Sequence, residues 1–452
     1  MDNPAFYEAT KKGRILALYI YDNSPGANKS PGEASKIWLH HSLLSLDMSL
    51  EKKLNVYEGK VAEVFSHLLE QYSVKQVYCN LSFEPTYKRH LKEVFALCKS
   101  KGVEFTAFNA NYLWHPSDLT KSDGDFYKVY TPFKNNALKT PPRKAIFRPK
   151  SFDAVKDSKN STTIRSLGLL PKKPWVHLIE NCWEIGEQAA LKKLSLFIKK
   201  NLSGYQQGRD FPAEDHTSKL SPHLHFGEIS PAQIYEKVLQ MPSSIDKTVF
   251  INELVWREYS TYLLHFFPHL EEKNFNPKFN AYPWKKTHPL LKAWQTGNTG
   301  YPFIDAAMKE LWQTGYMHNR ARMVVASFLV KNLHIHWHQG RDWFWDCLVD
   351  ADLASNSASW QWVAGCGVDA APFFRIFNPV TQGEKFDKEG EYVKRWIPEL
   401  KNLPVKYIHV PWTAPEDILL SAGVRLGKTY PYPIVDLSTT RLSALGWYKS
   451  LN

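Results

Sequence analysis

The stretch "DADLASNSASWQWVAGCG", residues 350–367, sets two acids, one Asn and two Trp residues among small side chains. Ala, Ser and Gly occupy little volume, so a bulky group must fit beside Trp360 and Trp362 if the packing is to be dense. On a helix, positions two apart point about 200° from each other. The pattern therefore predicts a helix whose two indole rings have different surroundings.

The length and composition of the chain indicate a globular protein of two domains. Its 452 residues exceed the size at which a single core usually stops growing. Hydrophobic residues make up 43% and charged residues 23%, which is typical of a folded protein. The sequence has no apolar run long enough to span a bilayer and no signal peptide, so we expect no membrane partner and a cytoplasmic location, nucleoid-associated in a bacterium.

The first part of the chain alternates the patterns of strands and helices. Short β-branched or aromatic runs predict strands at 15–21, 54–59, 76–81 and 104–109. Amphipathic segments between them predict helices at 33–50, 61–72 and 85–101. Repeated strand-helix units predict an α/β domain over 1–115, with a Rossmann-like, doubly wound parallel sheet.

The rest of the chain has a different pattern. Residues 116–180 are rich in Pro, Lys, Ser and Thr, which predicts an interdomain connector. Helical spacing begins again at 186–200 and then dominates. We therefore expect an all-α domain over 181–452.

Cysteine and histidine spacing gives no evidence of a metal centre. The cysteines (Cys79, Cys98, Cys182, Cys347 and Cys366) form no CxxC pair, so we expect neither a disulfide framework nor a zinc site. His334, His336 and His338 lie close in sequence, but a spacing of two on a helix would direct them to different faces. A metal site at these histidines is the less favoured interpretation.

The charge of the chain favours a polyanionic partner. The net charge is +12 and the pI is about 9.2. General solubility explains such charge equally well. The aromatic content of 14%, with 16 Trp and 22 Tyr, favours nucleic acid, because aromatic faces stack on bases or on planar cofactors.

Three further stretches of the helical region carry candidate site residues. In 205–230, hydroxyl groups and the Ser221-Pro222 helix start suit a phosphate, although ordinary N-capping is an equal alternative. In 252–259, Glu253 and Trp256 share a helix face, while Glu253 and Arg257 have the spacing of a surface ion pair. In 315–337, Asn319 and Met323 fall on one face and Arg322 points elsewhere.

These stretches together resemble the photolyase/cryptochrome family over nearly the whole chain. The motifs are GRDFPAEDHTSKLSPHL (208–224), NELVWREY (252–259), TGYPFIDAAMKEL (299–311), MHNRARM (317–323), DADLASNSASWQW (350–362) and RIFNPVTQGEKFD (375–387). They follow the order of that family's flavin domain. The sequence is most similar to class I DNA photolyases, which use reduced FAD to repair cyclobutane pyrimidine dimers.

The resemblance implies a set of FAD contacts. They are Tyr205, Thr217, Ser218, Lys219, Leu220, Ser221, Glu253, Arg322, Asp350, Ala351, Asp352 and Asn356. Arg322 and Asp350 match the family's buried ion pair beside the flavin. Asn356 matches the residue that faces the flavin ring nitrogen, where plant receptors of the family usually carry Asp. Asn at this position favours repair.

The resemblance also implies a substrate pocket for a flipped-out dimer. Its residues are Glu253, Trp256, Asn319, Arg320, Met323 and Trp362, with Arg209 as a phosphate or pocket partner. Two indole faces can clamp the dimer, while Glu253 hydrogen-bonds a thymine carbonyl as negative charge arrives on it. Enzymes of the family that act on the six-four photoproduct usually have His where Asn319 and Met323 stand, which argues against that substrate.

Three tryptophans match the family's electron relay to the flavin, namely Trp360, Trp337 and Trp284. Any one of them alone is more simply explained as core. Because all three fall at the motif positions, we expect them to supply electrons to the photo-excited, oxidised cofactor. The proposed catalytic set is therefore Glu253, Asn356 and these three tryptophans.

The N-terminal region matches the family's antenna domain less completely. The opening MDNPAFYEA (1–9) resembles the segment after the family's first strand, so we expect a domain that lacks this strand, through an upstream start or a shortened product. Glu84 lies where an antenna-binding carboxylate often does, whereas Ser82, Thr86 and Tyr87 depart from the folate and deazaflavin patterns. The pigment, methenyltetrahydrofolate or 8-hydroxy-deazaflavin, is left unassigned.

The sequence thus predicts a monomeric, light-driven lyase that acts on double-stranded DNA carrying pyrimidine dimers. The first alternative is a cryptochrome-type blue-light photoreceptor without repair activity. Such receptors commonly carry a long C-terminal extension, which this chain does not show. A second alternative is a nucleic-acid-binding module without chemistry, against which Glu253, Asn356 and the three tryptophans argue.

Overall fold

The computed structural model describes residues 2–24, 30–173, 175–285 and 289–451. The chain divides into two compact units, which are described separately. Unit 1 comprises Met1–Lys200 and Ser218–Pro268, and unit 2 comprises Asn201–Thr217 and His269–Asn452. Within the described ranges no helix is long and apolar enough to cross a membrane. Nor does any group of three or more His, Cys, Asp or Glu side chains there form a metal site.

The four predicted strands of unit 1 are confirmed, and they pair in parallel. They are β1 (Leu18–Tyr21), β2 (Asn55–Glu58), β3 (Gln76–Asn80) and β4 (Glu104–Phe108). The strand β1 pairs with β2, with Leu18 opposite Asn55, and β3 pairs with β4, with Gln76 opposite Glu104. Among the described residues these pairs form two separate sheets, not one continuous doubly wound sheet. That the domain lacks its first strand stays a prediction.

The helices predicted at 33–50, 61–72, 85–101 and 186–200 are present as α2 (Glu33–Ser49), α3 (Val61–Gln71), α4 (Pro85–Ser100) and α7 (Glu187–Lys200). Unit 1 also contains α1 (Pro4–Thr10), α5 (Tyr130–Ala137), α6 (Val176–Cys182), α9 (Ser221–His225), α10 (Pro231–Leu239) and α11 (Ile245–Phe266), with 3-10 turns at Pro116–Leu119 and Arg165–Leu167. The predicted connector is thus not free of structure, because it contains α5 and most of α6. The buried Trp38 of α2 donates its indole N–H to Glu228 at 3.0 Å.

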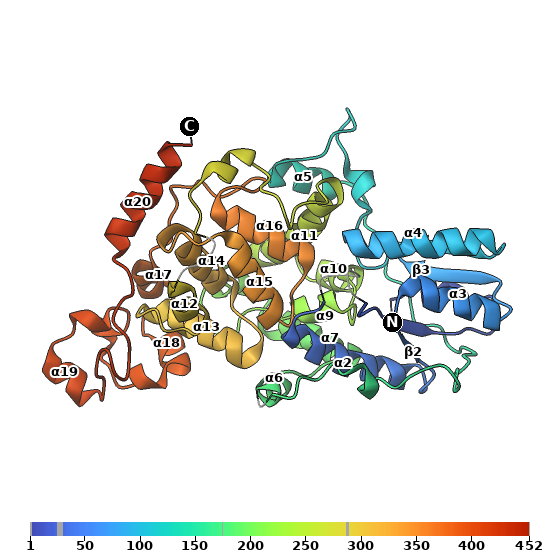
Figure 1. The fold of residues 1–452 in the computed structure, drawn as a ribbon, viewed down its shortest axis with the longest axis horizontal. Helices are drawn as coiled ribbons and strands as arrows, with labels where there is room; N and C mark the ends of the chain where they lie inside the picture. The colour runs from blue at the N-terminus through green and yellow to red at the C-terminus, as the bar shows by residue number, and fades with distance from the viewer. Residues whose placement is uncertain (1, 25–29, 174, 286–288, 452) are drawn as a thin grey trace. The chain divides into compact units, whose positions relative to one another are not determined.

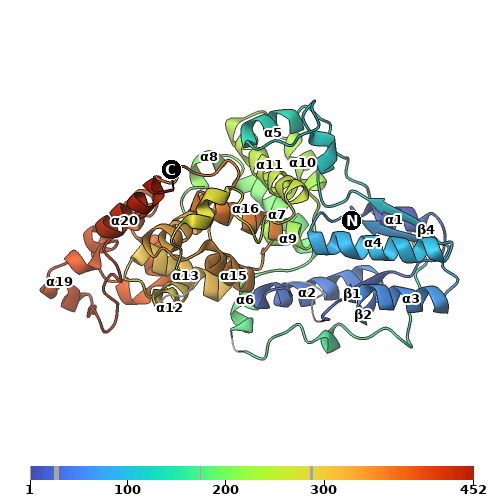
Figure 2. The same ribbon diagram turned by 45° about the horizontal axis from the view of Figure 1, so that its top comes forward.

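The long helix α11 places the unit 1 candidates. Ser244 caps its start by accepting from the Lys247 amide at 3.1 Å. Its buried face, which includes Leu254, Val255 and Tyr259, packs toward α5 and α10, and Figure 2 shows α7, α9, α10 and α11 together. Glu253 and Trp256 lie on the less buried side of the same helix.

Unit 2 is helical, as predicted. Its helices are α8 (Tyr205–Gly208), α12 (Leu290–Gln295), α13 (Pro302–Thr314), α14 (Asn319–Ser327), α15 (Trp337–Cys347), α16 (Leu353–Ala364), α17 (Pro379–Phe386), α18 (Glu391–Trp396), α19 (Glu416–Ser421) and α20 (Leu437–Lys449), with a π-helical turn at Phe328–Asn332 and 3-10 turns at Pro277–Ala281, Pro398–Leu400, Val405–Tyr407 and Pro411–Thr413. The core lies around α13 to α16, which are seen together in Figure 1.

Local capping signals define α16, the helix of the opening stretch. The Asp352 carboxylate accepts from the Ser355 amide at 2.7 Å and caps the N-terminus. The helix ends at Gly365, whose φ of +86° is the left-handed conformation that favours glycine. The residues between these two caps therefore have the helical spacing that the sequence predicts.

The three clustered histidines, His334, His336 and His338, do not share a helix. The prediction that helical spacing directs them to different faces is therefore wrong. The helix α15 begins at Trp337, and His336 caps it by accepting from the His338 amide at 3.1 Å. His334 has a φ of +57°. This left-handed turn interrupts the chain between the π-helical turn and α15.

Candidate functional site

A buried ion pair stands just before α16. One terminal nitrogen of Arg322, on α14, contacts both carboxylate oxygens of Asp350 at 3.0 and 2.9 Å. The Asp350 side chain is 3% exposed and that of Arg322 is 25% exposed. Because little water reaches this carboxylate, it requires the guanidinium as its counter-charge. The structure thus brings together two residues that are 28 positions apart.

Other polar groups gather around Arg322. Its Nε donates to the Met317 carbonyl at 2.7 Å, and its guanidinium lies 5.3 Å from the centre of the Tyr316 ring. Burial raises the pKa of Tyr316 to about 12, against the opposing effects of Arg322 and of a hydrogen bond with Thr217. Thr217, Arg322 and Asp350 therefore belong to one cluster, and Tyr316 is a further member that the sequence did not reveal.

Asn356 has a fixed orientation on α16. Its side chain is nearly buried, and Nδ2 donates to the Arg341 carbonyl at 3.0 Å. Because Nδ2 makes this bond, the acceptor atom Oδ1 of Asn356 points away from the Arg341 carbonyl. The Arg341 guanidinium lies 5.4 Å from the Trp337 ring centre and also donates to the Glu271 carbonyl. Arg341 thus connects two predicted site residues.

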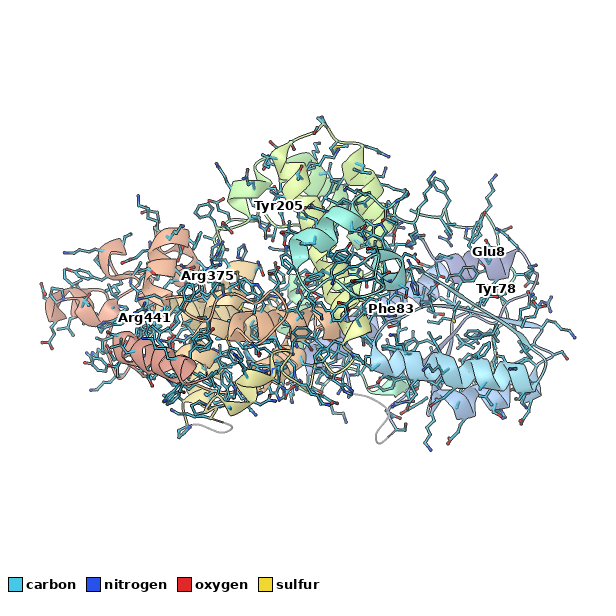
Figure 3. All side chains as sticks on the ribbon, turned by 90° about the horizontal axis from the view of Figure 1, so that it is seen from above. Glu8, Tyr78, Phe83, Tyr205, Arg375 and Arg441 are labelled. Atoms are coloured by element: carbon cyan, nitrogen blue, oxygen red, sulfur yellow. The ribbon has the colours of Figure 1, made fainter. Side chains whose placement is uncertain are left out.

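Two arginines among the substrate candidates have partners close by. Arg320 donates to Asp210 at 2.6 Å, and Arg209 lies over the Tyr205 ring at 5.5 Å from its centre. Tyr205 is buried on α8 and is labelled in Figure 3. His318 caps α14, and burial lowers its pKa to about 4, so it is neutral at pH 7.

The two tryptophans of α16 differ in exposure, as the helical spacing predicts. Trp360 is 2% exposed, whereas Trp362 is half-buried at the edge of the core. Trp360 packs edge-on against Phe344 at 5.0 Å and against Trp294 at 6.3 Å. Asn319 is exposed on α14, and Met323 is half-buried one turn later.

The three relay candidates lie in two groups of rings in unit 2: Trp360 with Phe344 and Trp294, and Trp337 and Trp284 with His336. A Cβ added to Gly340, three residues after Trp337 on α15, would overlap the six-membered ring of Trp360. Trp337 donates to Asn274 at 2.8 Å, and Trp284 donates to the Phe279 carbonyl at 3.0 Å. The His336 ring lies between these two indoles, 5.3 Å from Trp284 and 5.6 Å from Trp337.

The fit of Gly340 against Trp360 gives a stability prediction. Gly340→Ala is expected to lower the free energy of unfolding by about 1–3 kcal/mol, because the new methyl group forces an indole in a dense core to shift. Gly446→Ala on α20 is the matched control, since the added Cβ would meet nothing within 4 Å apart from its chain neighbours and the backbone of its own helix. The control should gain about 0.4–1 kcal/mol through helix propensity. Urea unfolding monitored by circular dichroism measures both, and equal effects would contradict the proposed packing.

In unit 1, Trp256 has an aromatic support. The Tyr130 ring, on α5, stacks on it with centroids 3.5 Å apart and planes at 5°. The Tyr130 hydroxyl donates to the Asn252 carbonyl at 3.0 Å. Burial raises the pKa of Tyr130, and the nearby Glu253 carboxylate raises it further. Trp256 is 36% exposed, which leaves indole surface available to a ligand. Arg257 pairs with Glu258 at 2.9 Å.

The predicted phosphate-binding segment of unit 1 has an unusual backbone. Lys219 has a φ of +48°, and the Leu220 amide donates to Ser218 Oγ at 3.4 Å. The chain then enters α9 at Ser221, which is exposed, followed by Pro222. The side chain of Leu220 is buried, whereas Ser218 and Ser221, which carry the hydroxyl groups, are more exposed.

The unit 2 residues fit the chemistry of a flavin nucleotide. Arg322 supplies a cation, Asn356 an oriented amide, and Thr217 a hydroxyl, which together match a polar ring edge and phosphate groups. Ala351, Ala354 and Ala358, in and just before α16, are small side chains. The backbone of Ala351 links Asp350 to the cap Asp352, so the ion pair and the start of α16 are held together.

Comparisons with known proteins agree with these observations. Residues 1–151 match the family model described as DNA photolyase, and residues 250–450 match the FAD binding domain of DNA photolyase. The chain is 45% identical to the deoxyribodipyrimidine photo-lyase of Agrobacterium fabrum, over all of this chain and 95% of that protein. It is 34% identical to cryptochrome-1 of Arabidopsis thaliana, over 97% of this chain and 67% of that protein.

Two solved structures have the same fold. A bacterial class III photolyase from Agrobacterium tumefaciens has a TM-score of 0.95 at 45% identity and covers 100% of this chain and 95% of its own. An archaeal photolyase from Sulfolobus tokodaii, described with two FAD molecules, has a TM-score of 0.84 at 30% identity and covers 99% and 96%.

Proposed function

The chain belongs to the photolyase/cryptochrome family, and on that premise we propose that it is a deoxyribodipyrimidine photo-lyase that repairs cyclobutane pyrimidine dimers in DNA. The observation that carries the proposal is the position of Asn356 and Trp360 four residues apart on α16, so that the oriented amide and the buried indole share a face. A face with these two groups suits a cofactor that changes both its charge and its electron count.

Reduced FAD, when bound, supplies the photo-excited electron donor for the flipped-out dimer. The chain holds the cofactor with Tyr205, Thr217, Ser218, Lys219, Leu220, Ser221, Glu253, Arg322, Asp350, Ala351, Asp352 and Asn356. Trp284, Trp337 and Trp360 are proposed as the source of reducing electrons. The buried Arg322–Asp350 pair supports the proposed cofactor contacts. Burying these two charges costs free energy unless they also face a polar group.

The proposed dimer contacts include two indoles and a carboxyl group. Trp256 and Trp362 offer indole faces, and Glu253 donates a hydrogen bond through a carboxyl O–H as negative charge reaches a base carbonyl. Asn319, Arg320 and Met323 complete the set, and the absence of His at positions 319 and 323 argues against the six-four photoproduct. The net charge of +12 favours the phosphate backbone, with Arg209 as one contact.

Subclass and antenna are finer parts of the proposal. The 45% identity to a structure described as a class III photolyase supports class III over the class I predicted from the motifs. The second FAD in the archaeal structure's description adds a flavin to the two pigments named above. The monomeric state and the cytoplasmic location stay predictions.

The test is repair under light. Purified protein with chemically reduced flavin is irradiated with an oligonucleotide that carries one thymine dimer, and intact thymines are measured. Light-dependent recovery supports the photolyase. Flavin binding and photoreduction without recovery would favour the cryptochrome alternative, and a protein that binds DNA without flavin would favour the module without chemistry.

Glu253→Ala is expected to lower the repair yield per absorbed photon by a factor of about 2–10, which corresponds to one hydrogen bond of about 0.5–1.5 kcal/mol. Glu253→Gln is the matched control, since it keeps a hydrogen-bonding group without the charge, and should retain most of the yield. Dimer affinity, measured in the dark, should change less than the yield. A loss confined to affinity would mean that Glu253 binds the dimer but does not stabilise its charge.

A further inference from the structure

The buried residue Tyr282 lies against Trp284, the most exposed of the three relay candidates. The Tyr282 ring centre is 4.2 Å from that of Trp284, and its side chain is 3% exposed. The Trp447 ring of α20 lies 5.8 Å away on another side. The Tyr282 ring is therefore closer to Trp284 than the His336 ring, which lies 5.3 Å from it.

Tyr282 also has a base within hydrogen-bonding distance. Its hydroxyl lies 3.2 Å from His334 Nδ1, and both groups are buried. Burial raises the pKa of Tyr282, so the phenol stays protonated at neutral pH. A phenol that loses an electron becomes a strong acid, and oxidation therefore requires an acceptor for its proton. An imidazole whose Nδ1 carries no proton is such an acceptor at this distance.

The backbone fixes this pair in place. The Lys285 amide donates to the His334 carbonyl at 2.8 Å, and the His336 amide donates to the Lys285 carbonyl at 3.1 Å, which forms a parallel bridge between Lys285 and Ile335. The bridge places Tyr282 beside His334 and Trp284 beside His336. His334 keeps the unusual φ of +57° in this arrangement, a strain that the surrounding contacts must offset.

We propose that Tyr282 and His334 form a proton-coupled terminal electron donor to Trp284. One electron passes from the Tyr282 ring to the indole radical cation of Trp284, while the phenolic O–H bond breaks and its proton moves to His334 Nδ1. The products are neutral Trp284, a neutral tyrosyl radical and the His334 imidazolium. The inference rests on the proposed function only for the oxidant that reaches Trp284.

This step moves the oxidised site from Trp284 to Tyr282, further along the proposed path from the group that accepted the electron. The electron cannot return to Tyr282 without the proton from His334, so the return is slower than return to a bare indole cation. The hydrogen bond supplies a direct path for the proton in both directions. The pair thus extends the lifetime of the separated charges.

The test uses the purified holoprotein without DNA and two independent oxidants. In one arm the bound, oxidised flavin is illuminated. In the other, a photogenerated ruthenium(III) polypyridyl complex oxidises the protein from solution. Electron paramagnetic resonance of rapidly frozen samples, with ring-deuterated tyrosine as the label, detects the radicals. A tyrosyl signal that forms more slowly in D₂O is expected in the wild-type protein.

Three variants locate this radical. Tyr282→Phe should lose the tyrosyl signal and leave an indole signal that decays faster. His334→Asn should lose it as well, because Asn tolerates a positive φ but is not a base. Tyr448→Phe, whose ring stacks on Phe373 at 4.6 Å, is the control and should keep the signal.

The outcomes separate this inference from the proposed function. A tyrosyl signal that depends on Tyr282 under the ruthenium oxidant but is absent under flavin illumination supports the pair and contradicts the proposed relay. An indole signal without a tyrosyl signal under both oxidants overturns the inference. So does a tyrosyl signal that survives Tyr282→Phe.

Discussion

Replacing Asp350 with alanine is expected to lower the free energy of unfolding by about 2–3 kcal/mol and to release the flavin. Breaking a fully buried ion pair costs about 3–5 kcal/mol, because one charge is left without a partner. The effect should fall below this range, since a quarter of the Arg322 side chain is exposed and water can solvate it in part. The remaining guanidinium would still be displaced from its contact with two carboxylate oxygens.

Urea unfolding measures the stability, and the flavin absorbance that stays with the protein after gel filtration measures retention. Glu391→Ala is the matched control: it removes the Lys394 pair at 3.1 Å, where Glu391 is 63% exposed. Exposed pairs contribute about 0–1 kcal/mol, so the control should keep both stability and flavin. The double change Arg322→Met with Asp350→Ala should recover part of the lost stability, because no buried charge remains unpaired. If Asp350→Ala behaves like Glu391→Ala, the pair is not the anchor proposed here.

The parts of the structure that sequence predicted well are set by local chemistry. Asp352 and Gly365 mark the two ends of α16 because an N-cap carboxylate and a left-handed glycine act within one helical turn. The four strands were located by their apolar runs in the same way. The arrangement of the strands depends on hydrogen bonds between distant segments. The described strands form two sheets, where the sequence predicts one.

The site required information that no local pattern contains. Arg322 and Asp350 were paired through the resemblance to a family and not through their spacing. Arg341 supports Asn356 with its backbone carbonyl, a group that every residue has, so its type gives no signal. Arg320 and Asp210 are 110 positions apart and of common types.

The histidines show how a wrong local assumption hides a contact. Treating 334–338 as helical placed His334 by helical geometry. The left-handed turn at His334 instead directs it to Tyr282, which is 52 positions away. A non-glycine residue with positive φ is uncommon, and nothing in the sequence indicated one here.

Trp360→Phe is expected to slow the photoreduction of bound, oxidised flavin by at least about tenfold, which a barrier increase of about 1.4 kcal/mol already produces. A phenyl ring is much harder to oxidise than an indole, so the step nearest α16 would be interrupted. Phenylalanine keeps an aromatic ring against Phe344 and Trp294, and the fold should be preserved. The rate is followed by flavin absorbance under blue light with an external reductant.

The same variant should repair dimers normally once its flavin is reduced chemically, because electrons then need not pass through Trp284, Trp337 and Trp360. Trp412→Phe is the control: this indole packs edge-on against Tyr301 at 5.3 Å and is not one of the three relay candidates. It should leave both rates unchanged. Equal loss of photoreduction and repair in Trp360→Phe would place Trp360 in flavin binding or dimer binding. Unchanged photoreduction would mean that electrons reach the cofactor by a route that does not use this indole.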